Sequence, residues 1–197
     1  MYSALMAYPK RTDRGRILAA ALEQVNQEGE ENLTIRAVAA RLQLAPNAIY
    51  RYFISLAALE AAVAEEARLR IHEVMTKAAS GKGHVETIHA ISEAYIRFAE
   101  QKPRLFALYL KTYRAAVCTP QCLRDRDFLS ENVARLYGEQ QASAAALALW
   151  AHLHGTAVLL VAGLIPTEQA FTSLTFGLQL WTSGAQNEST PELREGR

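Results

Sequence analysis

The sequence is short of residues that interrupt helices or cross-link chains. Among 197 residues there are 6 prolines, 10 glycines and 2 cysteines, and no run of alternating β-branched residues indicates a sheet. Alanine and leucine are abundant and 50% of the residues are apolar, which favours helices packed around a sizeable core. We therefore expect an all-α protein.

Cysteine and histidine are too few for a disulfide framework or a metal site. Cys118 and Cys122 leave open two interpretations, a redox-sensing pair or two ordinary thiols near a helix junction. The two close histidine pairs are two and five positions apart, spacings that chelate poorly from one helix: His152 with His154, and His84 with His89. The sequence predicts no metal ion and no cofactor.

The sequence predicts no targeting segment. The first residues, MYSALMAYPKR, contain no long apolar stretch after a basic segment, so we expect no signal peptide and a cytoplasmic protein.

Charge is unevenly placed along the chain. The net charge is only +1, but residues 10–16 contain four basic residues and one acid. Lys10, Arg11 and Arg14 thus form a basic arm, which either reaches a phosphate backbone or minor groove or is simply solvated.

Residues 140–187 are almost free of charge, since Glu168 is the single charged side chain in 48 positions. Two helices fit there, about 141–164 and 167–183, with Pro166 between them. A helix with no charged face is buried all round or buried against something outside its own chain. The apolar run 155–165 is too short to span a membrane.

We therefore expect this hairpin to form a subunit interface, with a central hairpin in a monomer as the alternative. The expected interface consists of large apolar and aromatic residues of the two helices: Trp150, His154, Val158, Val161, Phe171, Leu174, Leu178 and Trp181.

Apolar residues three and four positions apart predict helices along the rest of the chain. They cover about residues 12–28 and 35–42, begin again at 46, cover 56–79 and 84–101, begin at 103 and cover 121–137. With the hairpin this makes about nine helices. We expect an N-terminal domain over residues 1–55, a helical domain over 56–184 and a flexible tail over 185–197.

The stretch 34–53 has the features of two short helices joined by a tight turn. Thr34 can cap the first helix. Pro46 suits the first turn of the second helix, because a backbone N–H there would have no partner within the helix. Apolar residues stand at the two staple positions around each start. The second helix then presents side chains that bond to phosphates and base edges, namely Asn47, Tyr50, Arg51 and Tyr52. This pattern is typical of a helix-turn-helix.

About a dozen positions in residues 12–60 share a family spacing: Arg14-x-x-Ile17-Leu18-x-Ala20-Ala21, Gly29, Leu33-Thr34-Ile35, Val38-Ala39, Leu42, Leu44 and Ile49-Tyr50-x-Tyr52-Phe53. Together they resemble the TetR family of bacterial transcriptional regulators. Trp150-x-x-x-His154-Gly155 is similar to a signature of one class of TetR C-terminal domain. The resemblance implies an Ω-shaped homodimer that binds an operator through its third helix. It also implies release by a small molecule held in the C-terminal domain.

Residue roles follow from the same resemblance. Pro46, Asn47 and Ala48 match positions that face the major groove. Phosphate or base contacts are matched by Tyr50 and Tyr52, and phosphate contacts at the start of the second helix by Thr34 and Arg36. Arg51 has the chemistry to reach guanine or a phosphate.

Three positions depart from the family pattern. Gln43 stands where glycine is usual, which costs about 1 kcal/mol where φ is positive. Ala45 replaces a Ser or Thr cap worth roughly 1 kcal/mol. Leu56, preceded by Ile54, replaces a lysine, so the salt dependence of DNA binding should be shallower by about one unit per half-site.

The helical domain is expected to surround a cavity for a small apolar ligand with one or two polar handles. The candidate lining is Tyr95, Phe98, Phe106, Tyr109, Tyr113, Leu149 and His152, each with plain core packing as the alternative.

We therefore expect a ligand-responsive transcriptional repressor that binds double-stranded operator DNA as a homodimer, without an enzyme activity or a membrane role. One alternative is a thiol oxidoreductase using Cys118 and Cys122, which lack the CxxC spacing and a positioned base. The other is a small-molecule carrier whose helix-turn-helix no longer binds DNA.

Overall fold

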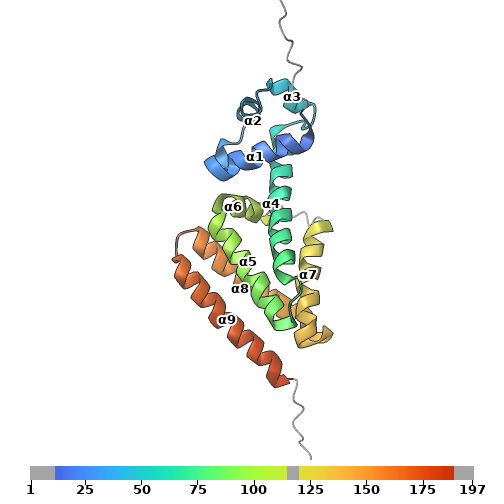
Figure 1. The fold of residues 1–197 in the computed structure, drawn as a ribbon, viewed down its shortest axis with the longest axis vertical. Helices are drawn as coiled ribbons and strands as arrows, with labels where there is room; N and C mark the ends of the chain where they lie inside the picture. Colours follow the sequence, from blue (N-terminus) through green and yellow to red (C-terminus); the bar gives the residue numbers. More distant parts are fainter. Residues whose placement is uncertain (1–11, 115–119, 189–197) are drawn as a thin grey trace, which may run out of the picture. The chain divides into compact units, whose positions relative to one another are not determined.

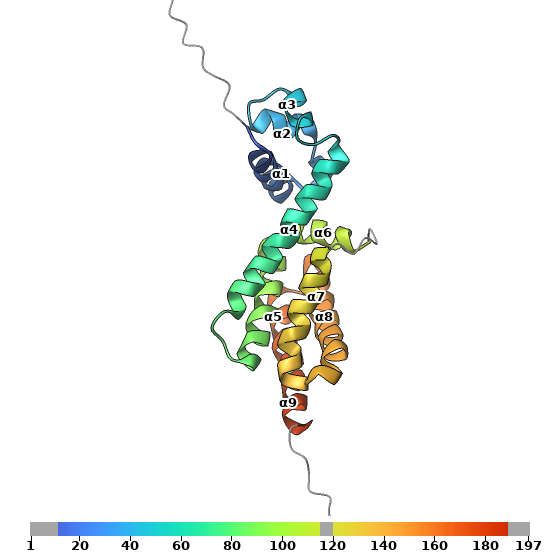
Figure 2. The same ribbon diagram turned by 90° about the vertical axis from the view of Figure 1, so that its right-hand side faces the viewer.

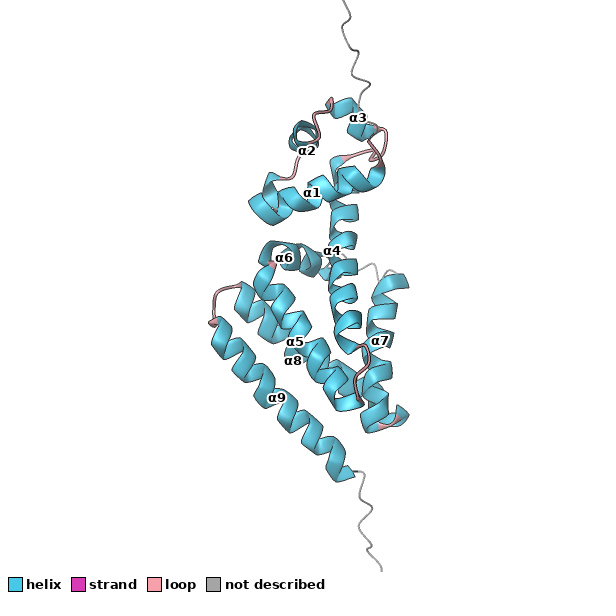
Figure 3. Cartoon of the chain, in the orientation of Figure 1, coloured by secondary structure: helices cyan, strands magenta, loops and turns pink. Residues whose placement is uncertain are grey.

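The computed structural model describes residues 12–114 and 120–188, and within these ranges the secondary structure is helical (Figures 1 and 3). Nine α-helices and one short 3-10 helix follow one another along the described chain. The prediction of an all-α fold with about nine helices is confirmed. The chain divides into two compact units, residues 1–66 and 67–197, and the division lies inside the long helix α4 (Leu56–Ala79).

The N-terminal unit contains four short elements and the first part of α4. They are α1 (Arg14–Glu28), the 3-10 helix η1 (Glu30–Asn32), α2 (Ile35–Arg41) and α3 (Pro46–Tyr50). Asp13 caps α1, because its Oδ1 accepts from the Arg16 N–H at 2.8 Å. The apolar faces of these helices meet in one core, formed by Ile17, Ala21, Val25, Leu33, Val38, Ile49, Phe53 and Leu59.

The second unit contains the rest of α4 and five further helices. These are α5 (His84–Gln101), α6 (Pro103–Arg114), α7 (Pro120–Tyr137), α8 (Glu139–Val161) and α9 (Thr167–Glu188). α8 packs against α5, α6, α7 and α9, and Figure 2 shows α5, α7 and α8 side by side. Its core is aliphatic and aromatic, with Ile88, Ile91, Tyr95, Ile96, Phe106, Leu149, Leu153 and Ala157 buried.

Local signals set most helix limits. α4 and α5 have the predicted bounds, and the Ser55 Oγ caps α4 by accepting from the Ala58 N–H at 3.1 Å. α9 is longer than expected: it continues to Glu188 instead of ending near residue 183. A single glycine, here Gly184, costs a helix only about 1 kcal/mol and does not end it. Lys10, Arg11 and residues 189–197 of the expected tail lie outside the described residues.

Candidate nucleic-acid interface

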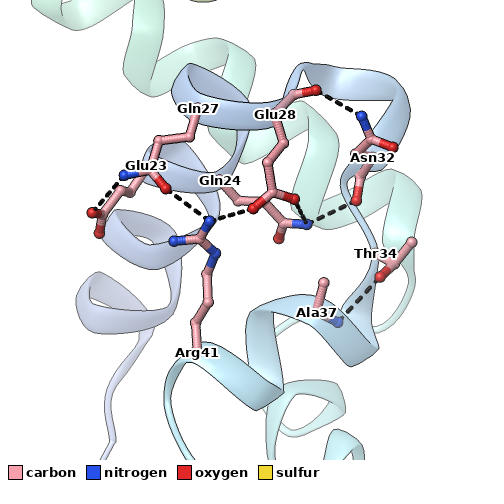
Figure 4. A network of polar contacts seen from close by, with 8 residues as sticks. All are labelled: Glu23, Gln24, Gln27, Glu28, Asn32, Thr34, Ala37 and Arg41. Atoms are coloured by element: carbon pink, nitrogen blue, oxygen red, sulfur yellow. Dashed lines mark hydrogen bonds and ion pairs between the residues drawn. The ribbon is translucent and has the colours of Figure 1, made fainter.

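α2 is fixed to α1 by a polar network around Arg41 (Figure 4). The Arg41 guanidinium donates to the Gln27 Oε1 at 2.9 Å and pairs with the Glu28 carboxylate. The buried Gln24 of α1 donates from Nε2 to the Asn32 carbonyl at 2.8 Å, just before α2 begins. Both ends of α2 are thereby tied to α1, so its direction is set before any partner binds.

The start of α2 and the turn after it have the geometry of a helix-turn-helix. The Ala37 N–H donates to the Thr34 Oγ1 at 3.1 Å, so Thr34 caps α2 as the sequence predicts. In the turn, Gln43 has a φ of 57°, the left-handed conformation for which glycine is usual. The Leu44 N–H then donates to the Ala39 carbonyl at 2.9 Å, which closes the turn.

α3 turns its apolar residue inward and its polar residues outward. Ile49 is fully buried, whereas Pro46, Asn47 and Arg51 are exposed and Tyr50 is 49% exposed. Ala48 is partly exposed. Ala45 precedes α3 without a side-chain cap bond, as the sequence predicts. The structure thus brings the predicted base-reading side chains together on one short exposed helix and on the turn after it, which begins at Arg51.

Residues on both sides of α3 complete this face. Thr34 and Arg36 are exposed at the start of α2. Tyr52 is 40% exposed, and its hydroxyl donates to the Thr12 carbonyl at 2.7 Å. The Arg14 guanidinium lies 5.0 Å from the centre of the Phe53 ring, so this part of the expected basic arm stacks on the unit itself. The sequence predicts neither the tyrosine bond nor the stacking, because each joins residues far apart in the chain.

In the second unit, three of the predicted ligand-lining residues, Tyr95, Phe106 and Tyr109, form an aromatic cluster. The Tyr95 ring centre lies 5.4 Å from that of Phe106 and 6.4 Å from that of Tyr109. Phe98 and Leu149 are also buried, and the side chain of Tyr113 lies outside those described. These side chains pack closely against one another. That they line a ligand cavity stays a prediction.

Trp150 and His154, expected at a subunit interface, are partly exposed and contact this cluster in their own chain. The Tyr95 hydroxyl and the His154 Nδ1 share a hydrogen bond of 2.9 Å, and the ring centres of Tyr95 and Trp150 lie 5.3 Å apart. Burial lowers the pKa of His154 from its ordinary value of 6.5, because the charged imidazolium loses solvation there. The two residues of the signature therefore contact their own chain.

Two other residues of the expected interface need correction. Leu174 and Leu178 of α9 are 3% and 2% exposed within a single chain, so they belong to its core. The Arg97 guanidinium lies 5.2 Å from the centre of the Phe171 ring and partly covers it. The ring centres of Trp181 and Tyr137 are 4.6 Å apart. The helical period could not show which stripe faces inward, because no charged face marks the outside.

The α8–α9 hairpin instead exposes a different set of apolar side chains. They are Leu147, Val158, Leu159, Leu164, Phe176 and Leu180, which we call the hairpin face. Val158 was predicted at the interface, and Val161 is partly exposed beside it. By length and composition α8 could also cross a membrane, although only 28% of its most apolar window is buried. That one helix is weak support for a membrane role, since core and interface helices share the same composition.

His152 lies where α8 crosses α9. A Cβ placed on Gly177 would be 2.4 Å from the His152 Nε2, so the imidazole uses the space that glycine leaves. This nitrogen is buried without a hydrogen-bond partner. No group of three or more possible metal ligands occurs among the residues that the structure describes.

Two protein families match the chain by sequence. The family described as bacterial regulatory proteins, tetR family, matches residues 17–65, and the tetracyclin repressor-like C-terminal domain matches residues 88–178. The chain is 26% identical over 180 residues to the uncharacterized HTH-type transcriptional regulator Rv0681 of Mycobacterium tuberculosis, covering 88% of this chain and 83% of that protein. It is 25% identical over 174 residues to the uncharacterized HTH-type regulator YobS of Bacillus subtilis, with 85% and 90% covered.

Solved structures share the fold. A protein of unknown function from Rhodococcus sp. RHA1 has a TM-score of 0.75 at 24% identity, covering 91% of this chain and 98% of its own. A TetR variant from Acinetobacter baumannii AYE, in complex with minocycline, has a TM-score of 0.67 at 20% identity, covering 92% and 100%. BioQ with its double-stranded DNA operator has a TM-score of 0.61 at 22% identity, covering 89% and 98%.

The helix-turn-helix and the helical second unit define a DNA-binding transcription regulator. The two family matches together cover well over half of the chain, and they fall on the two units. The chain belongs to the TetR family of bacterial transcriptional regulators.

Proposed function

We propose that the protein is a ligand-responsive repressor that binds a pseudo-palindromic operator as a homodimer. The observation that carries the proposal is the division of α3 into a buried Ile49 and an exposed set of base-reading side chains. Asn47 can donate to and accept from one base, Ala48 can touch a thymine methyl, and Arg51 can reach guanine or a phosphate. Thr34, Arg36 and Tyr50 supply phosphate contacts, and the basic residues before α1 add to them.

The hairpin face supports pairing of two copies. Its six side chains are apolar and exposed, and no charged residue lies on α8 between residues 140 and 161. Large apolar side chains exposed along two uncharged helices are typical of a surface that a partner covers. We place the second copy here. A dimer that binds two half-sites about one DNA turn apart needs its recognition helices near 34 Å apart. A regulator of this kind acts on the chromosome, so we place it in the cytoplasm.

A small apolar ligand in the second unit would release the operator. The aromatic cluster around Tyr95 offers ring surface and one polar handle, the hydrogen-bonded Tyr95–His154 pair. Because α4 contributes residues to both units, a ligand that tilts it changes the spacing of the recognition helices. The minocycline complex of the Acinetobacter TetR variant and the operator complex of BioQ support both halves of this proposal by analogy.

The test begins with selection of bound sites from a random DNA library. The enriched half-site and its spacing give the operator, and a palindromic site supports a dimer. On that operator, Tyr50→Ala and Arg51→Ala should each weaken binding by at least about thirtyfold, because about 1 kcal/mol is lost in each of two half-sites. Lys82→Ala removes an exposed cation from the second unit and should leave binding unchanged. If both α3 variants bind like the wild type, the assignment of α3 is overturned.

A further inference from the structure

We propose that Ile54 makes an apolar contact with the operator, on C–H groups at the edge of each half-site. The inference rests on the proposed DNA binding and adds a residue to it. Unlike an ionic contact with a phosphate, an apolar contact has a strength that salt screens little.

The exposed large apolar side chains of the N-terminal unit gather in one place. Within the described part of that unit they are Tyr50, Tyr52 and Ile54, all in five consecutive positions. Ile54 is 88% exposed, the largest value for a large apolar side chain among the described residues. Single exposed apolar residues are ordinary on protein surfaces, but a set confined to the end of a recognition helix marks a binding surface.

The turn that carries Ile54 is held from both sides. The Phe53 N–H donates to the Ile49 carbonyl at 3.0 Å, and the Phe53 ring is buried under the Arg14 guanidinium. On the other side, Ser55 is fixed as the cap of α4 by its bond to the Ala58 N–H. Ile54 therefore stands between two anchored residues and projects outward, which is a preorganised position for a contact.

The residues on either side of Ile54 offer no ionic contact. No charged side chain occurs between Tyr52 and Leu59, which includes the first turn of α4. What this edge can offer DNA besides backbone and hydroxyl groups is apolar surface. The matching surfaces on DNA are the thymine methyl in the major groove and the C–H edge of deoxyribose.

The Ile54 side chain adds almost nothing to the stability of its own unit. An isoleucine that is 88% exposed removes almost no apolar area from water, so a polar residue in this bend would serve folding equally well. The apolar area is still available to be buried by a partner. Its position directly after Tyr50 and Tyr52 makes it continuous with the proposed operator interface.

The experiment measures affinity for the selected operator at 50, 100 and 200 mM salt. Ile54→Ala should weaken binding about fivefold per half-site, or roughly 25-fold for a dimer, with the same slope of log affinity against log salt. Ile54→Lys should steepen that slope by about one unit per half-site, because it adds a phosphate contact. Leu69→Ala, which truncates a 40% exposed apolar residue of α4 outside the N-terminal unit, is the matched control and should bind like the wild type.

A second arm separates the two DNA surfaces. Deoxyuridine in place of thymidine removes only the methyl group at the edge of the half-site. If this change weakens the wild type and abolishes its advantage over Ile54→Ala, the contact is to the methyl; if the advantage persists, the contact is to deoxyribose. Both results support the inference.

Two results would overturn it. If Ile54→Ala binds like the wild type at every salt concentration while Tyr50→Ala loses binding, the inference fails and the proposed function stands. If the wild type enriches no sequence from the library, the proposed function fails and the inference fails with it.

Discussion

Gln43 holds the turn between α2 and α3 in a conformation that most side chains avoid. Its φ of 57° brings the Cβ close to the neighbouring backbone, at a cost of about 1 kcal/mol relative to glycine. The bond from the Leu44 N–H to the Ala39 carbonyl keeps the turn in this form. The strain is therefore local, and the angle between α2 and α3 is maintained despite it.

Gln43→Gly should raise the free energy of unfolding by about 1 kcal/mol, because glycine adopts positive φ without a steric penalty. Urea titration followed by circular dichroism measures the change. Gln43→Ala keeps the Cβ and should give no gain, which separates relief of backbone strain from loss of the glutamine side chain. A glycine variant less stable than the alanine variant would contradict the argument.

His154 links stability to pH at the residue scale. Burial lowers its pKa below 6.5, so the unfolded chain takes up the proton at a higher pH than the folded one. The contribution of the neutral imidazole is complete above pH 6.5 and is lost as the pH falls from 6.5 through the lower, folded pKa. Protonation also places a charge beside the buried Tyr95 ring.

We expect the free energy of unfolding to fall more steeply between pH 7 and pH 5 in the wild type than in His154→Gln. Glutamine can still bond to the Tyr95 hydroxyl but does not titrate. Parallel urea titrations across this range give both slopes, and the other histidines contribute equally to each. Identical slopes would show that His154 does not couple folding to pH.

At the scale of elements, the α8–α9 hairpin is the part whose orientation needed the structure. Its helices were predicted within a few residues, yet Leu174 and Leu178 turn inward, and Trp150 and His154 are partly covered by their own chain. The exposed side chains are the hairpin face, led by Leu147 at 67% and Phe176 at 63%. An uncharged helix gives no sequence signal for which side meets the core, so packing against α5 and α7 makes the choice.

Leu147→Glu and Phe176→Glu should each convert the proposed dimer largely to monomer, because a carboxylate buried in an apolar interface loses its hydration without a partner. Sedimentation velocity at several concentrations measures the state, and circular dichroism checks that the helices persist. Leu69→Glu, at an exposed position on α4, serves as the control and should remain dimeric. Dimers of unchanged stability in both hairpin variants would place the interface elsewhere.

At the scale of the whole molecule, the sequence was sufficient for most of the secondary structure. Thr34 accepts the backbone bond expected of it, Asp13 and Ser55 accept equivalent bonds, and the bounds of α4 and α5 agree with prediction. These features depend on neighbours three or four positions apart, which the sequence displays directly. The family membership rests on the same local spacing and is confirmed.

The candidate site could be predicted in part for a similar reason. The outward residues of α3 follow from its period and from the buried Ile49, so Asn47, Tyr50 and Arg51 could be named in advance. The stacking of Arg14 on Phe53 and the bond from Tyr52 to Thr12 could not, because they join segments far apart in sequence. The outward projection of Ile54 was missed because an apolar residue in a bend gives no local signal of its side.

The sequence by itself determined the class of fold, the helix-turn-helix with its caps and unusual Gln43, and the charge-free hairpin. Each of these is a property of consecutive residues and their period. Tertiary structure alone decided that the Trp150 and His154 pair closes on Tyr95, that Gly177 makes room for His152, and which stripe of α8 and α9 stays exposed. The physical reason is that helices without charged faces can pack on any side, and their side is chosen by the shapes of the neighbours they bury.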